Sequence, residues 1–289
     1  MFSKILTNKF NNEKRLKLHQ KDIPSIRDIM LENELYAIQM YPSSEGGKKN
    51  IDFLQSVADL VKELNIFTES NSKVDFTGLE VCTNLEDLQV EVPKKSPIDI
   101  SNNTKLKKIY IDDCVSLTGL ENLEQIESLI IGRNSSKILN SEFFSRQKPK
   151  FKTLSLSHAD LSGGLGFLEN QRLQSLWIFT SKGVNLEAVS RLGIKNLLLD
   201  GCRDIKNIDE LSRAHTLEEI KIIDSDVVPS ARIFASLNSL KTLAVLGKSS
   251  FVEGDLSCLK NKLHHFSFNN KRHYSIKNEE FDDKFLLKE

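Results

Sequence analysis

The chain has 289 residues, of which 39% are hydrophobic and 28% charged, a composition typical of a soluble globular protein with one large domain or two ordinary ones. Lysine and arginine total 40 and aspartate and glutamate total 40, so no net charge attracts nucleic acid or an anionic membrane. No stretch approaches the roughly 20 consecutive apolar residues of a membrane-spanning helix. Met1–Phe10 lacks the apolar run of a signal peptide. We therefore expect a cytoplasmic protein that binds neither nucleic acid nor membranes.

Cysteine and histidine spacing gives no support for a metal centre. The four cysteines lie far apart with no C-x-x-C pair, which is typical of a reduced compartment and not of a disulfide scaffold or zinc site. The six histidines show no H-E-x-x-H spacing. We predict no catalytic residues, no metal ligands and no cofactor.

The first 60 residues hold a weak copy of a pattern that dominates the rest of the chain. The pattern is apolar-x-x-apolar-x-apolar, and it occurs here at Leu35-Ile38-Met40, ahead of the polar stretch Tyr41–Asn50. A second weak copy, Val61-Leu64-Ile66, keeps a similar spacing. We expect residues 1–60 to form an atypical cap that is continuous with the repeats and covers the end of their core.

From residue 61 to residue 270 the pattern recurs at a nearly constant spacing. Nine strong copies follow one another 20 to 25 residues apart, and they begin at Leu85, Leu106, Ile126, Phe151, Leu173, Ile194, Leu217, Leu240 and Leu263. A period of this length marks a repeat in which each coil contributes one short strand. The three apolar side chains point inward, and successive coils lay their strands side by side in a parallel sheet. The expected fold is an α/β solenoid with a curved parallel sheet on its concave face and an irregular convex side.

The repeat resembles that of the leucine-rich-repeat family, whose signature is L-x-x-L-x-L-x-x-N/C-x-L. The ninth position holds Cys114, Asn134 or Cys202 in three copies and Ser181 or Ser225 in two more. The resemblance implies that these side chains bond backbone groups of the adjoining turn. Four copies depart from the signature at this position, with Pro93, Ala159, Lys248 and Lys271. The family is a scaffold for many unrelated binders, so the resemblance is specific for fold and not for function.

Residues 271–289 break the pattern, and we expect them to form a C-terminal cap or tail. They begin with Lys271-Arg272-His273-Tyr274-Ser275, a stretch similar to one in leucine-rich-repeat immunity proteins of bacterial polymorphic toxin systems. This second resemblance implies a protein that binds and neutralises one cognate toxin. The Lys-, Asn- and Ser-rich composition is compatible with a bacterial source.

The candidate binding residues lie between and just after the apolar repeat positions, where strand alternation turns side chains toward solvent. Trp177, the single tryptophan, falls there beside Phe179, and stacking of the coils is expected to join them to Leu198, Ile223 and Leu246 in one apolar patch. The rim expected around the patch is Asp112, Asp113, Arg133, Asp200 and Asp224, and the further candidates on the same concave face are Tyr110, His158 and Lys221. A tryptophan in an apolar patch with a polar rim is typical of a protein-binding hot spot. If the register is wrong, or the tail folds over these residues, Trp177 lies in the core instead.

These patterns favour a non-catalytic protein-binding module, in its sharpest form an immunity-type protein that neutralises a toxin through its concave face. The acidic rim suits a basic partner surface, such as that of a basic toxin domain. The first alternative is an effector or adaptor that docks a partner protein in a larger assembly. The second alternative is an enzyme with a site in the N-terminal region. We expect the chain to be a monomer by itself.

Overall fold

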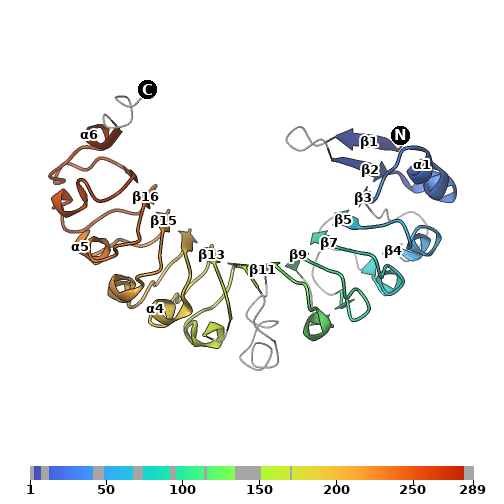
Figure 1. The fold of residues 1–289 in the computed structure, drawn as a ribbon, viewed down its shortest axis with the longest axis horizontal. Helices are drawn as coiled ribbons and strands as arrows, with labels where there is room; N and C mark the ends of the chain where they lie inside the picture. The colour runs from blue at the N-terminus through green and yellow to red at the C-terminus, as the bar shows by residue number, and fades with distance from the viewer. Residues whose placement is uncertain are drawn as a thin grey trace. The chain divides into compact units, whose positions relative to one another are not determined.

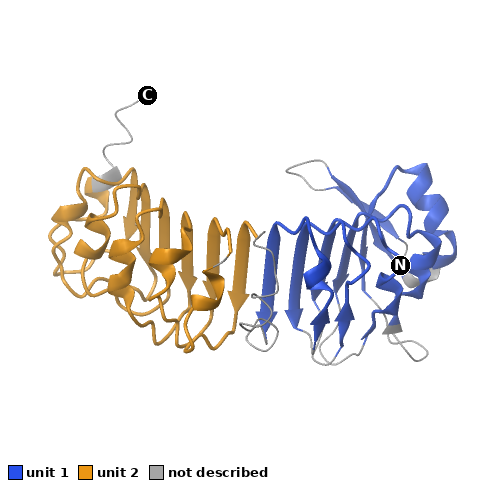
Figure 2. Ribbon diagram, turned by 60° about the horizontal axis from the view of Figure 1, so that its bottom comes forward, with its two compact units in different colours: residues 1–138 blue, residues 139–289 orange. Residues whose placement is uncertain are grey.

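The computed structural model describes residues 3–7, 13–41, 49–67, 74–91, 96–113, 116–133, 151–169 and 171–282. The chain divides into two compact units, residues 1–138 (unit 1) and 139–289 (unit 2), which Figure 2 shows in different colours. Each unit carries one row of short strands, and each is described by itself.

Unit 1 contains the strand order β1-β2-β3-β5-β7-β9-β11. The first pair is antiparallel and every later pair is parallel. The strands span Lys4–Thr7 (β1), Lys14–Leu18 (β2), Ala37–Met40 (β3), Glu63–Phe67 (β5), Asp87–Glu91 (β7), Lys108–Asp113 (β9) and Ser128–Arg133 (β11). The antiparallel β1 thus lies at the start of a sheet that is otherwise parallel.

The return segments of unit 1 are irregular. After β2 come the 3-10 helix η1 (Gln20–Ser25) and then the α-helix α1 (Ile26–Glu32). The other 3-10 helices are η2 (Asp52–Ser56), η3 (Thr77–Leu79) and η4 (Leu120–Asn122). Two small parallel ladders pair β4 (Lys49–Asn50) with β6 (Val74–Asp75) and β8 (Ile98–Asp99) with β10 (Leu117–Thr118).

Unit 2 contains six parallel strands in sequential order. They are β12 (Thr153–Ser157), β13 (Ser175–Phe179), β14 (Asn196–Asp200), β15 (Glu219–Ile223), β16 (Thr242–Leu246) and β17 (His265–Phe268). The return segments contain η5 (Gly166–Leu168), α4 (Val189–Leu192), η6 (Ile208–Arg213), α5 (Arg232–Ala235), η7 (Ser257–Leu259) and α6 (Glu279–Asp282). In Figure 1 the strands of this unit line one side and the short helices the other.

The apolar repeat positions form the core between the strands and the return segments. In the coil of β15, Leu217, Ile220 and Ile222 are fully buried. The weak copy Leu35-Ile38-Met40 is buried in the same way, although its spacing from the strong copies is less regular. Because all three positions of each coil point inward, no coil buries its apolar side alone and neighbours stabilise one another. The predicted leucine-rich-repeat solenoid, with its parallel sheet and irregular return side, is confirmed.

Five of the six described coils of unit 2 leave their strand through a residue in the left-handed conformation at the eighth repeat position. These residues are His158, Thr180, Gly201, Asp224 and Gly247, with φ between 46° and 67°. The turn aims the backbone N–H at the next coil: Thr180 N–H donates to the Asp200 carbonyl at 2.7 Å and Gly201 N–H to the Ile223 carbonyl at 2.9 Å. Strands β12 to β16 therefore all end at the seventh repeat position.

Buried hydroxyl groups close the turns one residue later. Ser181 Oγ accepts the Ala159 N–H at 3.0 Å, and Ser225 Oγ accepts the Cys202 N–H at 2.9 Å. Each hydroxyl also donates to a carbonyl of its own strand, so both of its hydrogen-bonding functions are used. The coil that carries Lys248 at the ninth position uses the next residue instead, because Ser249 Oγ accepts the Ser225 N–H at 2.8 Å.

These bonds confirm the role that the family resemblance assigned to Ser181 and Ser225. Cys202 is buried in the same slot with its Sγ 3.3 Å from the Ile178 carbonyl oxygen. Pro93, Cys114 and Asn134 lie outside the described residues.

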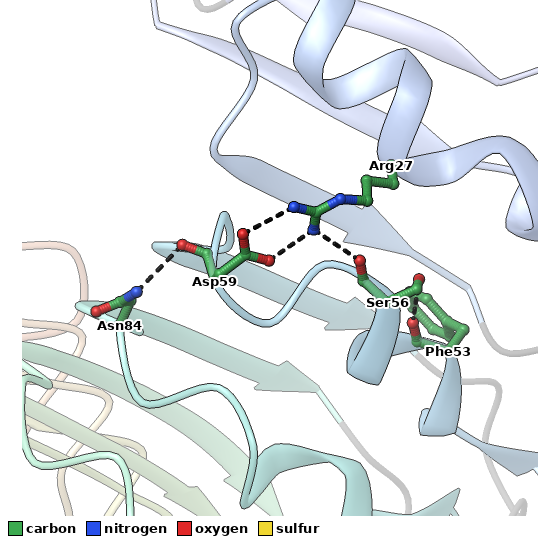
Figure 3. Close-up of polar contacts among 5 residues, drawn as sticks. All are labelled: Arg27, Phe53, Ser56, Asp59 and Asn84. Atoms are coloured by element: carbon green, nitrogen blue, oxygen red, sulfur yellow. Dashed lines mark hydrogen bonds and ion pairs between the residues drawn. The ribbon is translucent and has the colours of Figure 1, made fainter.

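On the return side of unit 1, one ion pair joins α1 to the following coil (Figure 3). The Arg27 guanidinium binds both carboxylate oxygens of Asp59, at 2.6 and 2.9 Å, and donates to the Ser56 carbonyl at 2.9 Å. The Asn84 amide of the next coil donates to the Asp59 carbonyl at 3.1 Å. The pair is solvent-exposed, so it positions α1 more than it stabilises the unit.

The stretch Lys271–Ser275 closes the end of the unit 2 core. The Tyr274 hydroxyl accepts the Phe251 N–H at 2.8 Å, and its ring packs edge-on against Phe251 with centroids 6.2 Å apart. Ser275 Oγ accepts the Leu256 N–H at 3.0 Å. Packing and hydrogen bonding thus account for Tyr274 and Ser275 of this stretch. The division into caps at 1–60 and 271–289 around repeats at 61–270 stays a prediction.

Replacing Ser225 by alanine tests the hydroxyl bonds. Ser225→Ala leaves the Cys202 N–H buried without an acceptor, and we expect the free energy of unfolding to fall by about 1–3 kcal/mol in urea denaturation. The matched control is Ser267→Ala, at an exposed position on β17, with an expected change within about 0.5 kcal/mol. Equal losses in the two variants would contradict the assigned role of Ser225.

Candidate functional site

Two of the side-chain columns on the strand face of unit 2 carry the candidate binding residues. One column contains the fifth repeat positions, Ser155, Trp177, Leu198, Lys221 and Ala244, paired strand to strand. The other contains the seventh positions, Ser157, Phe179, Asp200, Ile223 and Leu246. Side chains in one column are direct cross-strand neighbours, about 4.8 Å apart along the sheet.

An aromatic and aliphatic group lies at the centre of this face. Trp177 and Phe179 are both partly exposed on β13, and Trp177 pairs with the partly exposed Leu198 of β14. The backbone of these residues is fixed by pairing on both sides of β13. Because Trp177 is partly exposed, the register predicted from the repeat is correct at this strand.

The predicted single apolar patch is interrupted. Asp200 lies between Phe179 and Ile223 in the seventh-position column, and Lys221 follows Leu198 in the fifth-position column. Trp177, Phe179 and Leu198 therefore form one apolar group, here called the tryptophan group, and Ile223 and Leu246 form another. The prediction placed Asp200 on a rim and did not place Lys221 inside the patch, because it did not follow the columns from strand to strand.

Asp200 and Lys221 are partly exposed and differ in their contacts. The Lys221 ammonium forms an ion pair with Glu219 on its own strand. Within the described part of the chain, no hydrogen-bond donor or cation contacts the Asp200 carboxylate.

Two of the polar candidates belong to the left-handed turns that follow the strands. His158 is exposed, and its Nδ1 is 2.7 Å from the hydroxyl oxygen of Ser157. Asp224 is exposed, and its carboxylate accepts the Lys248 N–H at 2.9 Å. A Cβ atom at Gly247 would lie only 2.2 Å from that carboxylate, so Asp224 and Gly247 are packed together. Asp224 thus has a structural partner, unlike Asp200.

Three of the predicted residues form a polar cluster on the strand face of unit 1. Arg133 donates to Asp112 at 2.8 Å, and this hydrogen bond raises the pKa of the arginine. Tyr110 is partly exposed, and its burial, with the charge of Asp112 as the next cause, raises the pKa of its hydroxyl. The charges of this cluster are matched within unit 1. The prediction set Asp112 and Arg133 on the rim of the Trp177 patch; both lie on the strand face of unit 1, and their role at that rim stays a prediction.

The expected exposure of Asp113 is wrong. Its side chain is only 1% exposed. Strand β9 continues through Asp113, where the strands of unit 2 have already turned, so alternation points this side chain to the interior. Asp113 is accordingly removed from the candidate binding residues.

A second aromatic site, on the strand face of unit 1, was missed by sequence reasoning. Tyr41 is 52% exposed and stacks on Phe67 with ring centroids 5.4 Å apart. The Lys17 ammonium lies 5.2 Å from the centre of the Tyr41 ring. The only sequence signal was the position of Tyr41 just after the weak copy at Leu35, in a stretch read as polar.

Neither a metal site nor a membrane span is found in the part of the chain that the structure describes. No group of three or more His, Cys, Asp or Glu side chains there is arranged to hold a metal ion. No helix among the same residues is long and apolar enough to span a bilayer.

Comparison with known proteins gives structural likenesses only. No protein-family model matches the sequence, and no curated protein matches it. The chain is similar to internalin C2 of Listeria monocytogenes, with 20% identity and a TM-score of 0.46 over 74% of this chain and 84% of that chain. It is also similar to the functional domain of InlJ from Listeria monocytogenes, with 14% identity and a TM-score of 0.43 over 85% of this chain and 65% of that chain.

A leucine-rich-repeat protein of Leptospira interrogans has 14% identity and a TM-score of 0.34 over 88% of this chain and 81% of that chain. Likenesses at this level say nothing of what this chain binds.

Truncating Trp177 tests its place on the surface. We expect Trp177→Ala to unfold cooperatively in urea with a loss of about 1 kcal/mol. Leu197→Ala, which removes a side chain only 1% exposed on the neighbouring strand, should cost about 2–5 kcal/mol. A loss in Trp177→Ala as large as that in Leu197→Ala would place Trp177 in the core.

Proposed function

We propose that the chain is a non-catalytic protein-binding module that contacts its partner through the strand face of unit 2. The observation that carries the proposal is the tryptophan group, an apolar surface that stays partly exposed on strands whose neighbours pair with them on both sides. Tryptophan is enriched among the residues that dominate binding energy at protein interfaces, and apolar neighbours that exclude water strengthen it.

The rigidity of the face supports the same proposal. The strands hold Trp177, Phe179 and Leu198 in place before binding, so little backbone entropy is lost when a partner covers them. A standard interface buries roughly 1,600 Å² in total, about 800 Å² from each partner.

The sharper form of the proposal is an immunity-type protein that neutralises a cognate toxin. Its support is the resemblance of Lys271–Ser275 to immunity proteins, together with Asp200 and Asp224 on the binding face, which suit a basic toxin domain. The role of Tyr274 and Ser275 in closing the core gives that stretch a second explanation. The alternative function is an adaptor that docks a partner in a larger assembly through the same face. A partner that is not toxic would favour the adaptor.

Co-expression with neighbouring genes tests both the function and the face. Each gene adjacent to that of this chain is expressed alone and together with the chain, and growth is followed. The toxin proposal predicts that one neighbour arrests growth, that the wild-type chain relieves the arrest, and that the purified pair forms a complex.

Two variants of the chain make this experiment specific. Trp177→Ala should weaken the complex by about 2 kcal/mol or more, roughly 30-fold in Kd, because a hot-spot side chain is removed. Val252→Ala, which truncates an apolar residue 60% exposed outside the strands, should bind as the wild type does. A complex that survives Trp177→Ala unchanged would move the binding site away from this face, and a bound but harmless neighbour would favour the adaptor.

A further inference from the structure

Asp200 differs from the other carboxylates of the strand faces in having no partner within the described part of the chain. Each of the others has a cation or a hydrogen-bond donor as partner: Arg15 for Glu63, Lys108 for Asp87, Gln89 for Glu91, Arg133 for Asp112, Lys221 for Glu219 and the Lys248 N–H for Asp224. Asp200 lacks a partner because of the strand register. Its cross-strand neighbours are Phe179 and Ile223, and neither side chain can donate a hydrogen bond.

The nearest cation on the next strand is already engaged. Lys221 is offset by one column from Asp200 and forms its ion pair with Glu219. In the free chain, water solvates the Asp200 carboxylate, because the side chain is partly exposed. A partner that covers the tryptophan group and Ile223 displaces this water from both sides of Asp200. A carboxylate that loses its water without gaining a donor is strongly unfavourable.

Given the proposed binding function, on which this step rests, we infer that the partner seats an arginine side chain on the Asp200 carboxylate, between Phe179 and Ile223. The strands of these two residues lie roughly 10 Å apart, on either side of β14. An arginine offers a planar guanidinium that binds a carboxylate with two hydrogen bonds and stacks on an aromatic ring such as Phe179. Its aliphatic stem packs against Ile223.

The indole of Trp177 adds a second requirement. Its N–H has no acceptor among the residues that the structure describes, and a covered indole N–H usually finds one. The partner segment therefore carries an arginine and, two strand spacings or less from it, a backbone or side-chain oxygen. The occupant is a polypeptide with a basic residue among apolar ones, and not a nucleic acid, because a phosphate backbone would meet the unpaired carboxylate.

A peptide selection measures this requirement directly. A displayed library of random 16-residue peptides is selected on the full-length wild-type chain, and binders that Trp177→Ala does not retain are kept. The inference predicts an arginine at one fixed position among apolar residues. The best peptide is then synthesised with arginine or with citrulline, which has the same shape and no charge.

We expect citrulline to weaken binding to the wild type on the order of 30-fold or more, as for loss of one member of a buried charge pair. The same replacement should change little on Asp200→Asn, which keeps the side-chain shape and removes the charge. The matched control is Asp224→Asn, because that carboxylate already has an internal partner and its amide retains an acceptor oxygen. On this control the arginine peptide should still bind better than the citrulline peptide.

Different outcomes count against the role of Asp200 and against the binding face. Peptides that require Trp177 but contain no conserved basic residue, or that bind Asp200→Asn as tightly as the wild type, overturn the role of Asp200 and leave the binding face standing. A selection that yields no peptide dependent on Trp177 counts against the proposed function itself.

Discussion

Closure of the coils by left-handed turns and buried hydroxyl groups is the constraint on which the rest of unit 2 depends. A solenoid coil must leave its strand at a fixed place and still satisfy the backbone N–H groups that the turn buries. The hydroxyls of Ser181, Ser225 and Ser249 meet this need, and Tyr274 makes the same kind of bond to Phe251 N where the repeats stop. Because the strands end in step, their side chains stack in columns. A shift by one residue would exchange the core for the surface.

The candidate binding face is a consequence of these columns. They place Trp177 beside Leu198, and they also place Asp200 between Phe179 and Ile223, where no side chain can pair with it. An interface built on this face combines apolar contact with one carboxylate that must be matched. The apolar contact supplies affinity and the carboxylate supplies selectivity, since a partner without a donor at that place leaves the charge unpaired. Unit 1 presents a different surface, in which Arg133 neutralises Asp112 and Tyr41 stacks on Phe67.

The repeat period was enough to predict the fold and its core, because burial of three apolar positions in every coil leaves a signal that single substitutions do not erase. The same period fixed the register, and so the exposure of Trp177 and Phe179 was predicted correctly. Contacts between side chains of neighbouring coils could not be predicted from the repeat period. Whether β9 continues to Asp113 depends on the position of the turn that follows it, and no residue type in the sequence marks that position. The partnership of Asp224 with Lys248 and the isolation of Asp200 appear only when cross-strand pairs are compared. The stacking of Tyr41 lay in a stretch whose polar composition masked it.

Hydroxyl-radical footprinting of the chain, free and in complex with its partner, tests the binding face most directly. The method reports the solvent exposure of individual side chains. In the free chain Trp177, Phe179 and Leu198 should be modified, whereas the buried Ile178, Leu197 and Leu199 of the same strands should not. In the complex the account predicts that modification of Trp177, Phe179 and Leu198 falls sharply while Val252 stays reactive. Undiminished modification of Trp177 in the complex would contradict the central claim that the partner covers the strand face of unit 2.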